Sequence, residues 1–439
     1  MQTTVETLGQ LERRVNVAVP IAHIEGEVQK RLARLAKTVK LPGFRPGHVP
    51  LKMVAQQYGP QLRSEVISDA VQTSFADAIK EQNLRVAGYP RIEPRTGADG
   101  AADALEFQAT FEVYPDVKLG DIASLSVERP VADVTPADVD HTLDVLRKQR
   151  ATYAPVARPA ANGDRVTVDF TGTLDGVEFP GGQAKDFAIM LGEGRMLPEF
   201  EAAVAGMSAG ETRTFPLTFP ADYHGKEVAG RTASFALTAK EVSETRLPPL
   251  DSAFATAFGI ASGDVADLRA EVEQNLKLEL KRKIEGAVKE QVLKGLRAKA
   301  EFAVPSSLVD MEATTLMQRM AQNLQQQGMK AEDVKLSPDL FRPQAEDRVV
   351  LGLVLNELVR AEGLGARPEQ VKALVTELAQ TYEQPDAVVR WHYEKPERLN
   401  EFEAQVAEKN VVDWVLSKAR VVDQPTTFDA LMSPAARGA

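Results

Sequence analysis

The spacing of apolar residues changes along the chain, and each change predicts a different kind of element. The segments 11–19 (LERRVNVAV) and 105–113 (LEFQATFEV) alternate apolar and polar positions, as half-buried strands do. Between them, residues 21–37 and 60–82 carry apolar residues at helical spacing, with Pro20 just before the first helix and Pro60 in the first turn of the second. Residues 1–115 are therefore predicted to form a mixed α/β domain.

A connector and a β-rich region follow. Residues 116–150 are predicted to be a linker that contains a helix, with Thr135 as its cap, Pro136 at its first position and Asp138 completing a capping box. Residues 151–245 hold short alternating segments at 165–174, 211–219 and 232–242, separated by the turn sequences DG, PGG, LGEG and AG. This rhythm predicts a compact antiparallel β domain.

From residue 246 the pattern is helical to the end of the chain. Apolar residues recur at helical spacing over 264–300, 305–327, 344–362, 367–382 and 396–420. The expected fold is a multidomain α+β protein. Its domains would be 1–115, 151–245 and an all-α domain over 246–439, joined by the linker 116–150.

Composition excludes several kinds of chemistry. The 439 residues include no cysteine and five histidines, so disulfides, cysteine nucleophiles, Fe–S clusters and thiolate zinc sites are excluded and a metal site is not expected. No glycine motif of the Walker type occurs, which predicts no nucleotide cofactor. The N-terminus lacks the apolar core of a signal peptide, and the run VVLGLVLNELV is about half of the roughly 20 residues that span a membrane. A cytoplasmic protein without a membrane partner is expected.

One window departs from the net charge of −11: residues 28–64 contain no Asp or Glu. They hold His48 and eight cations: Lys30, Arg31, Arg34, Lys37, Lys40, Arg45, Lys52 and Arg63. A solvated helix face is the ordinary interpretation of such a run. Because the rest of the chain is acidic and the run contains a stiff loop, an anionic partner such as nucleic acid is favoured instead.

That loop is LPGFRPGHVP, residues 41–50. Pro42 favours an extended conformation at Leu41 and so ends the preceding helix, while Pro46 and Pro50 limit the freedom of the loop. Little entropy is then lost when Phe44 and Arg45 bind a partner, and aromatic and Arg side chains are frequent interface anchors.

The loop resembles the ribosome-docking motif of the trigger factor family, chaperones that sit at the ribosomal tunnel exit. The family pattern usually has a lysine near His48 and another residue at Pro46. The resemblance implies docking on the large ribosomal subunit, on a tunnel-exit protein and ribosomal RNA. The residues it assigns to this contact are Gly43, Phe44, Arg45, Pro46, Gly47, His48, Lys37, Lys40 and Lys52.

The β region is similar to an FKBP-type prolyl isomerase in the order of four segments: VDFTGTLDGVEF, DFAIMLGEGRMLPEFEAAVAGMSAGE, FPADYHG and TASFALTAKEV. Carried over by position, the catalytic pocket would consist of Phe170, Phe179, Phe187, Met196, Leu197, Phe200, Tyr223 and Phe235. Free-standing relatives have a Tyr–Asp pair where this chain has Phe170 and Pro180, and a longer loop after Tyr223. A more apolar, less selective pocket is expected. The alternative is that these rings only fill a β core.

The helical region carries no recognisable chemistry. Met311, Met317, Met320 and Met329 are separated by several glutamines. On sequence alone these methionines are better interpreted as core, although methionine also suits adaptable binding surfaces. The trigger factor resemblance reverses that preference and implies that they bind unfolded clients.

The predicted function is an ATP-independent, ribosome-associated chaperone that binds nascent and unfolded polypeptides and isomerises X-Pro bonds. A homodimer off the ribosome is left open. Two alternatives come from other classes of protein. One is a prolyl isomerase with a specific folded partner, which leaves the acid-free window unexplained. The other is an RNA-binding translation factor, which does not explain an apolar pocket beside an acidic helical region.

Overall fold

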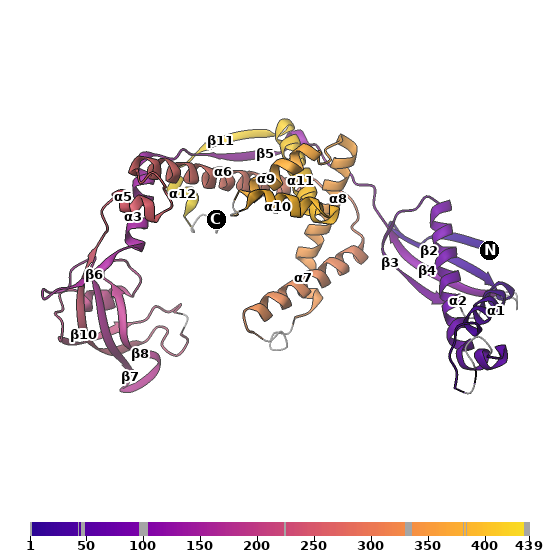
Figure 1. Ribbon diagram of the computed structural model, residues 1–439, viewed down its shortest axis with the longest axis horizontal. Helices are drawn as coiled ribbons and strands as arrows, with labels where there is room; N and C mark the ends of the chain where they lie inside the picture. Colours follow the sequence, from indigo (N-terminus) through magenta and orange to yellow (C-terminus); the bar gives the residue numbers. More distant parts are fainter. Residues whose placement is uncertain are drawn as a thin grey trace. The chain divides into compact units, whose positions relative to one another are not determined.

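The computed structural model describes residues 2–42, 44, 49–95, 104–223, 225–329, 336–380, 382 and 384–433. Contacts divide the chain into two compact units, each built from separate stretches of sequence. Unit 1 comprises residues 1–129 and 286–424, and unit 2 comprises residues 130–285 and 425–439. The prediction of a multidomain α+β protein is confirmed, with helices and antiparallel sheets in both units (Figure 1).

Unit 1 begins with a four-stranded antiparallel sheet in the order β1-β2-β4-β3. Its strands are β1 Gln2–Thr7, β2 Glu12–Pro20, β3 Val86–Pro94 and β4 Ala104–Val113. The helices α1 (Ile21–Ala36) and α2 (Leu51–Glu81) pack on one face of this sheet (Figure 1). Valines 15, 17 and 19 of β2 supply the centre of the core because strand alternation turns them all to that face.

Helix α2 corrects the sequence prediction at Pro60. The sequence predicts a helix that starts at Pro60, but α2 begins nine residues earlier, after Pro50, and Pro60 lies inside it. A proline within a helix removes one backbone hydrogen bond. Here Pro60 is exposed, and the buried residues Val54 and Val66 anchor the helix to two different apolar clusters on either side of it. Tertiary packing therefore overrides the local break.

The rest of unit 1 is largely helical. It contains the end of α6 (Val265–Ala298), then α7 Ser306–Gln326, α8 Arg342–Glu362, α9 Pro368–Ala379, α10 Pro385–Tyr393 and α11 Asn400–Lys418. The prediction that the chain stays helical to its end is wrong, because β11 (Arg420–Pro425) pairs with β5 (Ser126–Val131). That partner lies almost 300 residues away, so no local pattern announces the pairing.

Unit 2 is built around a five-stranded antiparallel sheet in the order β6-β10-β7-β8, with β9 paired to β10. The strands are β6 Thr152–Pro155, β7 Arg165–Leu174, β8 Val177–Met190, β9 Thr212–Thr218 and β10 Thr232–Arg246. The helices are α3 Pro136–Gln149, α4 Pro198–Val204, α5 Ser252–Ala257, α12 Phe428–Met432 and the start of α6.

Two local sequence predictions in unit 2 are confirmed by the structure and one is not. The capping box of α3 is formed: Thr135 Oγ1 accepts from Asp138 N, and the Asp138 carboxylate accepts from Thr135 N at 2.7 Å. Asp175 and Gly176 both have positive φ and make a two-residue hairpin between β7 and β8. The PGG sequence, expected to break a strand, instead forms an irregularity within β8.

Candidate functional site

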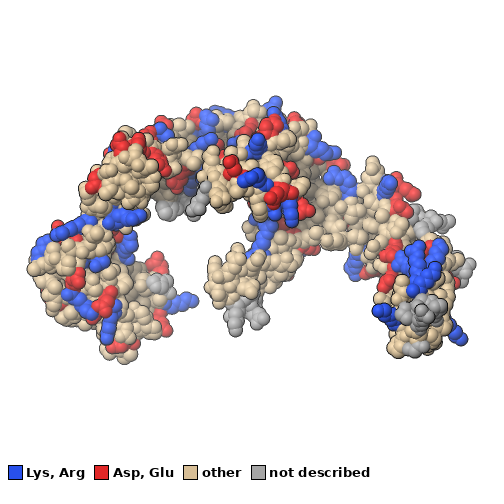
Figure 2. Space-filling model, viewed as in Figure 1, with Lys and Arg blue, Asp and Glu red and all other residues tan. Residues whose placement is uncertain are grey.

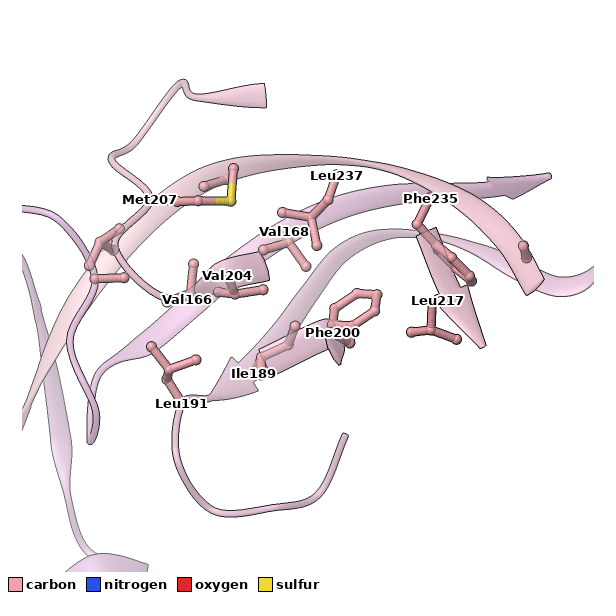
Figure 3. Close-up of a cluster of buried hydrophobic side chains, with 14 of the residues drawn as sticks. Val166, Val168, Ile189, Leu191, Phe200, Val204, Met207, Leu217, Phe235 and Leu237 are labelled. Atoms are coloured by element: carbon pink, nitrogen blue, oxygen red, sulfur yellow. The ribbon is translucent and has the colours of Figure 1, made fainter. Parts of the chain in front are cut away.

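The β domain of unit 2 encloses a cavity of about 620 Å³. It is lined by Phe170, Phe179, Pro180, Gly181, Gly194, Arg195, Met196, Leu197, Phe200, Leu217, Phe219, Tyr223, Gly225, Val228 and Phe235. Figure 3 shows the buried cluster beside it, in which Phe200, Leu217 and Phe235 gather at one end. The lining residues come from β7, β8, β9, β10, α4 and the loops between them, so the cavity exists only in the folded sheet.

Phe200 of α4 forms the floor of this cavity. Its side chain is 2% exposed, and its ring meets those of Phe170, Phe215 and Phe235 edge-on, with centroids 5.3, 5.6 and 5.9 Å apart. Such edge-to-face pairs are favourable because the positive ring edge faces the negative ring face. The floor is thus held by rings from three different strands.

Two glycines make room for the rings on the cavity walls. A Cβ at Gly172 would lie 2.7 Å from the Phe235 ring, and one at Gly182 would lie 2.8 Å from the Phe179 ring. Any larger residue at either position would displace the ring concerned. Gly172 and Gly182 therefore shape the cavity without lining it.

A single carboxylate holds the loop that closes one side of the cavity. Glu201, next to Phe200 on α4, accepts hydrogen bonds from the backbone N–H groups of Gly192 and Met196, at 3.3 and 3.4 Å. Met196 and Leu197 belong to this loop and line the cavity. The short helix α4 therefore fixes both the floor and one wall.

Seven of the eight pocket residues expected from sequence line the cavity. The exception is Phe187, which is not among the lining residues; it is 38% exposed and its ring lies edge-on to Phe170 at 5.8 Å. The expected set omitted Leu217 and Phe219. The alternation of Phe215, Leu217 and Phe219 along β9 and just beyond it was the signal that would have found them.

The cavity has little polar character. Among its lining side chains only Arg195 and Tyr223 carry a polar group, and Arg195 is largely exposed and paired with Glu193 at 3.0 Å. The Phe170 and Pro180 substitutions noted in the sequence both lie in the lining, which is consistent with the expected apolar pocket. Such a site can bind an apolar prolyl segment, and none of the described lining residues is a nucleophile.

A second group of candidate residues lies in the N-terminal domain. Gly43, Arg45, Pro46, Gly47 and His48 fall outside the described residues. Phe44 is 39% exposed, and Lys37, Lys40 and Lys52 are exposed without an ion pair in the part of the chain that the structure describes. Figure 2 shows Lys and Arg gathered over α1 and α2.

A small apolar cluster supports the two ends of this loop. Val39, just before the loop, and Val49, near its end, are buried in a cluster with Leu32 of α1 and Val54 of α2. Because both ends are anchored, Phe44 is presented from a fixed base. This cluster adjoins the sheet core of the same domain, because the partly buried Val28 packs against both.

The four methionines lie on or after α7. Met311, Met320 and Met329 are exposed and Met317 is half-buried, whereas Val309, Ala313 and Leu316 form the buried face of the helix. Met311 also lines a shallow groove of about 300 Å³ with Tyr114, Leu308, Val349 and Leu353. Three of the four methionines are thus surface residues, and the face of α7 visible in Figure 2 carries little charge.

Comparison with known proteins gives matches along the whole chain. The family profile "Bacterial trigger factor protein (TF)" matches residues 1–146, the profile of its C-terminus matches 264–417, and "FKBP-type peptidyl-prolyl cis-trans isomerase" matches 156–240. No described helix is long and apolar enough to cross a membrane.

Curated relatives give the same result. Trigger factor from Aromatoleum aromaticum is 52% identical over 99% of this chain and 100% of its own, and that from Dechloromonas aromatica is 52% identical over 98% and 99%. A solved trigger factor chaperone structure covers 95% of this chain and 99% of its own at 18% identity, with a TM-score of 0.48. The family assignment rests on the sequence matches.

The two alternative functions do not account for these matches, because a lone isomerase or an RNA-binding factor would not match both terminal profiles. The FKBP-type domain makes the protein a peptidyl-prolyl cis-trans isomerase. The chain therefore belongs to the trigger factor family, chaperones that carry a prolyl isomerase domain within one polypeptide.

Proposed function

We propose that this protein isomerises X-Pro bonds in the cavity of the β domain while other surfaces hold it on the ribosome and bind the unfolded chain. The observation that carries the proposal is the concentration of seven expected pocket residues around one apolar cavity. The proposed catalytic residues are Phe170, Phe179, Met196, Leu197, Phe200, Tyr223 and Phe235, which line the cavity, together with Phe187, which lies outside the lining and packs edge-on against Phe170.

An apolar cavity suits this reaction. The barrier to rotation about the peptide bond, roughly 18–20 kcal/mol, comes from amide resonance. That resonance places partial charges on the oxygen and nitrogen of the planar amide. An apolar lining stabilises these charges less than water does, so it favours the twisted amide relative to the planar one. Rotation therefore needs no nucleophile and no proton transfer from the protein.

Ribosome docking is assigned to the 43–50 loop and the lysines beside it. The exposed Phe44 ring is an apolar anchor. Lys37, Lys40 and Lys52, which have no ion pair with another described residue, are cations that can contact phosphate. The proposed partner is the large ribosomal subunit at the tunnel exit, through both protein and RNA. Binding at this surface should weaken as salt rises, since phosphate contacts release counterions.

Client binding is assigned to α7. Its exposed methionines and neighbouring glutamines form an adaptable surface that carries little charge, which suits unfolded chains of varied sequence. A chaperone acting on nascent chains would work in the cytoplasm. A homodimer of the free protein is also part of this proposal.

Co-sedimentation with ribosomes tests the docking surface. The double variant Phe44→Ala/Arg45→Ala should lose pelleting with ribosomes while retaining isomerase activity, because the loop is remote in sequence from the cavity. A matched control is Tyr89→Ala/Arg91→Ala, which removes an aromatic ring that is 82% exposed and an arginine from β3 of the same domain. Wild-type pelleting of the first variant, or equal loss in both, contradicts the proposal.

A further inference from the structure

The N-terminal sheet and α7 are joined within unit 1 by two groups of contacts. Leu119, which follows the sheet, forms an antiparallel bridge with Ala300, which precedes α7. Gly120 N–H donates to Lys299 O at 2.9 Å, and Glu301 N–H donates to Lys118 O at 3.1 Å. The two chain segments that link these elements to the rest of unit 1 are thus paired with each other.

The second group of contacts lies at the first turn of α7, seven residues along each segment from the Leu119–Ala300 bridge. There the Glu112 carboxylate of β4 accepts from Ser307 N at 2.7 Å and from Ser306 N and Oγ, both at 3.1 Å. The N-cap residue of α7, Pro305, makes no side-chain cap, and the first turn has no acidic residue. Glu112 therefore supplies the cap and the negative charge that a helix start normally receives from its own sequence.

A glycine allows this close approach. Gly88 of β3 has φ +76°, and a Cβ built on it would lie 2.7 Å from the Ser307 Cβ. Ser307 Oγ also donates to Ala87 O at 2.9 Å. The start of α7 is thus seated on both β3 and β4.

Glu112 is ionised in this position at neutral pH. Partial burial raises the pKa of its carboxyl, but the hydrogen bonds from Ser307 and Ser306 outweigh burial and lower the pKa below its usual value. An ionised acceptor makes stronger hydrogen bonds than a neutral one, so each bond to the α7 start is charge-assisted.

We propose that Glu112 is a positioning residue that couples the N-terminal sheet to α7, so that the helix follows the domain that carries the docking loop. The functional reading of this coupling, that ribosome docking orients the client-binding helix, rests on the proposed function above. The mechanical coupling itself does not. It follows from the Glu112 cap on α7, the pairing of the segments around Leu119 and Ala300, and the close approach of Ser307 to Gly88.

Because the chain has no cysteine, the coupling can be measured with two introduced labels. Glu25→Cys on α1 and Gln318→Cys on α7 are both exposed positions for nitroxide labels in the full chain. Pulsed electron spin resonance should give one narrow distance distribution in the parent and a clearly broader one in Glu112→Ala. Hydrogen exchange of the peptide covering the α7 start should become about tenfold faster in Glu112→Ala. The reason is that the loss of one charge-assisted hydrogen bond raises the equilibrium constant for local opening about tenfold or more.

A matched control is Glu106→Ala, which removes another β4 carboxylate whose partner, Arg95, lies within the same sheet domain. It should leave the distance distribution unchanged. Ser307→Asp, a substitution outside the sheet, places a second negative charge against Glu112 and should broaden the distribution even if Glu112→Ala disturbs the sheet. Narrow, parent-like distributions in both Glu112→Ala and Ser307→Asp would overturn the proposal. All readouts use the free protein, so they stand whether or not the loop docks on ribosomes.

Discussion

The cavity of the β domain and the exposed face of α7, the two surfaces that we propose contact the unfolded chain, are built on opposite principles. The cavity is concave and lined by aromatic rings that hold one another in edge-to-face contacts. The α7 face carries unbranched methionine and glutamine side chains, and Met311, Met320 and Met329 are exposed on it or just after it. The first has a fixed shape suited to one small feature, an X-Pro bond. The second can adapt to many sequences because methionine has several rotatable bonds.

The two surfaces therefore depend on the surrounding fold to different degrees. Removing one ring from the cavity disturbs every ring that packs on it, so site and stability are coupled. Removing a methionine from the α7 face leaves the buried side of the helix, formed by Val309, Ala313 and Leu316, intact. The rigid site should therefore be sensitive to single substitutions, whereas the adaptable site should lose function gradually.

The largest effect is expected from Phe200→Ala. Emptying a fully buried ring position costs about 3–5 kcal/mol of folding free energy. If about 1.4 kcal/mol of this appears as lost transition-state stabilisation, kcat/KM for a prolyl peptide falls tenfold. A peptide isomerisation assay and a denaturant melt measure the two quantities.

Phe254→Ala is the matched control for this prediction. Phe254 is a buried ring of the same unit but belongs to the cluster around α3 and α5, outside the β domain. It should destabilise unit 2 without lowering isomerase activity. An active, folded Phe200→Ala protein would show that the floor of the cavity is not part of the site.

An intermediate effect is expected from replacing Met311, Met320 and Met329 together by serine. These side chains are exposed, so stability should change by less than about 1.5 kcal/mol in total. Suppression of aggregation during dilution of a denatured client, followed by light scattering, should fall several-fold, with isomerase activity unchanged. Serine at three exposed apolar positions elsewhere, Val145, Leu278 and Leu340, serves as the control. Equal loss in both triple variants would remove the special role of α7.

The smallest effect concerns acid. Hydrogen bonds from Arg158 lower the pKa of Asp164 below its ordinary 3.8; burial opposes this shift, and the Ala161 N–H reinforces it. A carboxyl with a lowered folded-state pKa stabilises the fold above its unfolded-state pKa, and this contribution is lost as pH falls through the folded-state value. Below about pH 4, the β domain should therefore lose the stability that the ionised Asp164 contributes. An Asp164→Asn variant should lack this contribution at every pH. Hydrogen exchange of β7 at neutral and acid pH measures this loss of stability. The same pH dependence of β7 exchange in the parent protein and in Asp164→Asn would contradict the prediction.

The sequence alone determined features that depend on near neighbours. Alternation placed β2, β4, β7 and β10, the Thr135 and Asp138 spacing gave the α3 cap, and Asp175-Gly176 gave a hairpin. Resemblance by position then placed most of the cavity rings. These signals succeed because strand alternation, capping and tight turns are set by side chains within a few residues of each other.

Only the tertiary structure decided the features that join distant segments. Pro60 sits within α2 because apolar clusters on both sides of it hold the helix, and β11 is a strand because β5 offers its edge. The start of α7 is capped by Glu112, whose position in the sequence, on a strand 194 residues away, gives no sign of this role. In each case the free energy comes from a partner that folding brings near, and a pattern read within one segment contains no information about that partner.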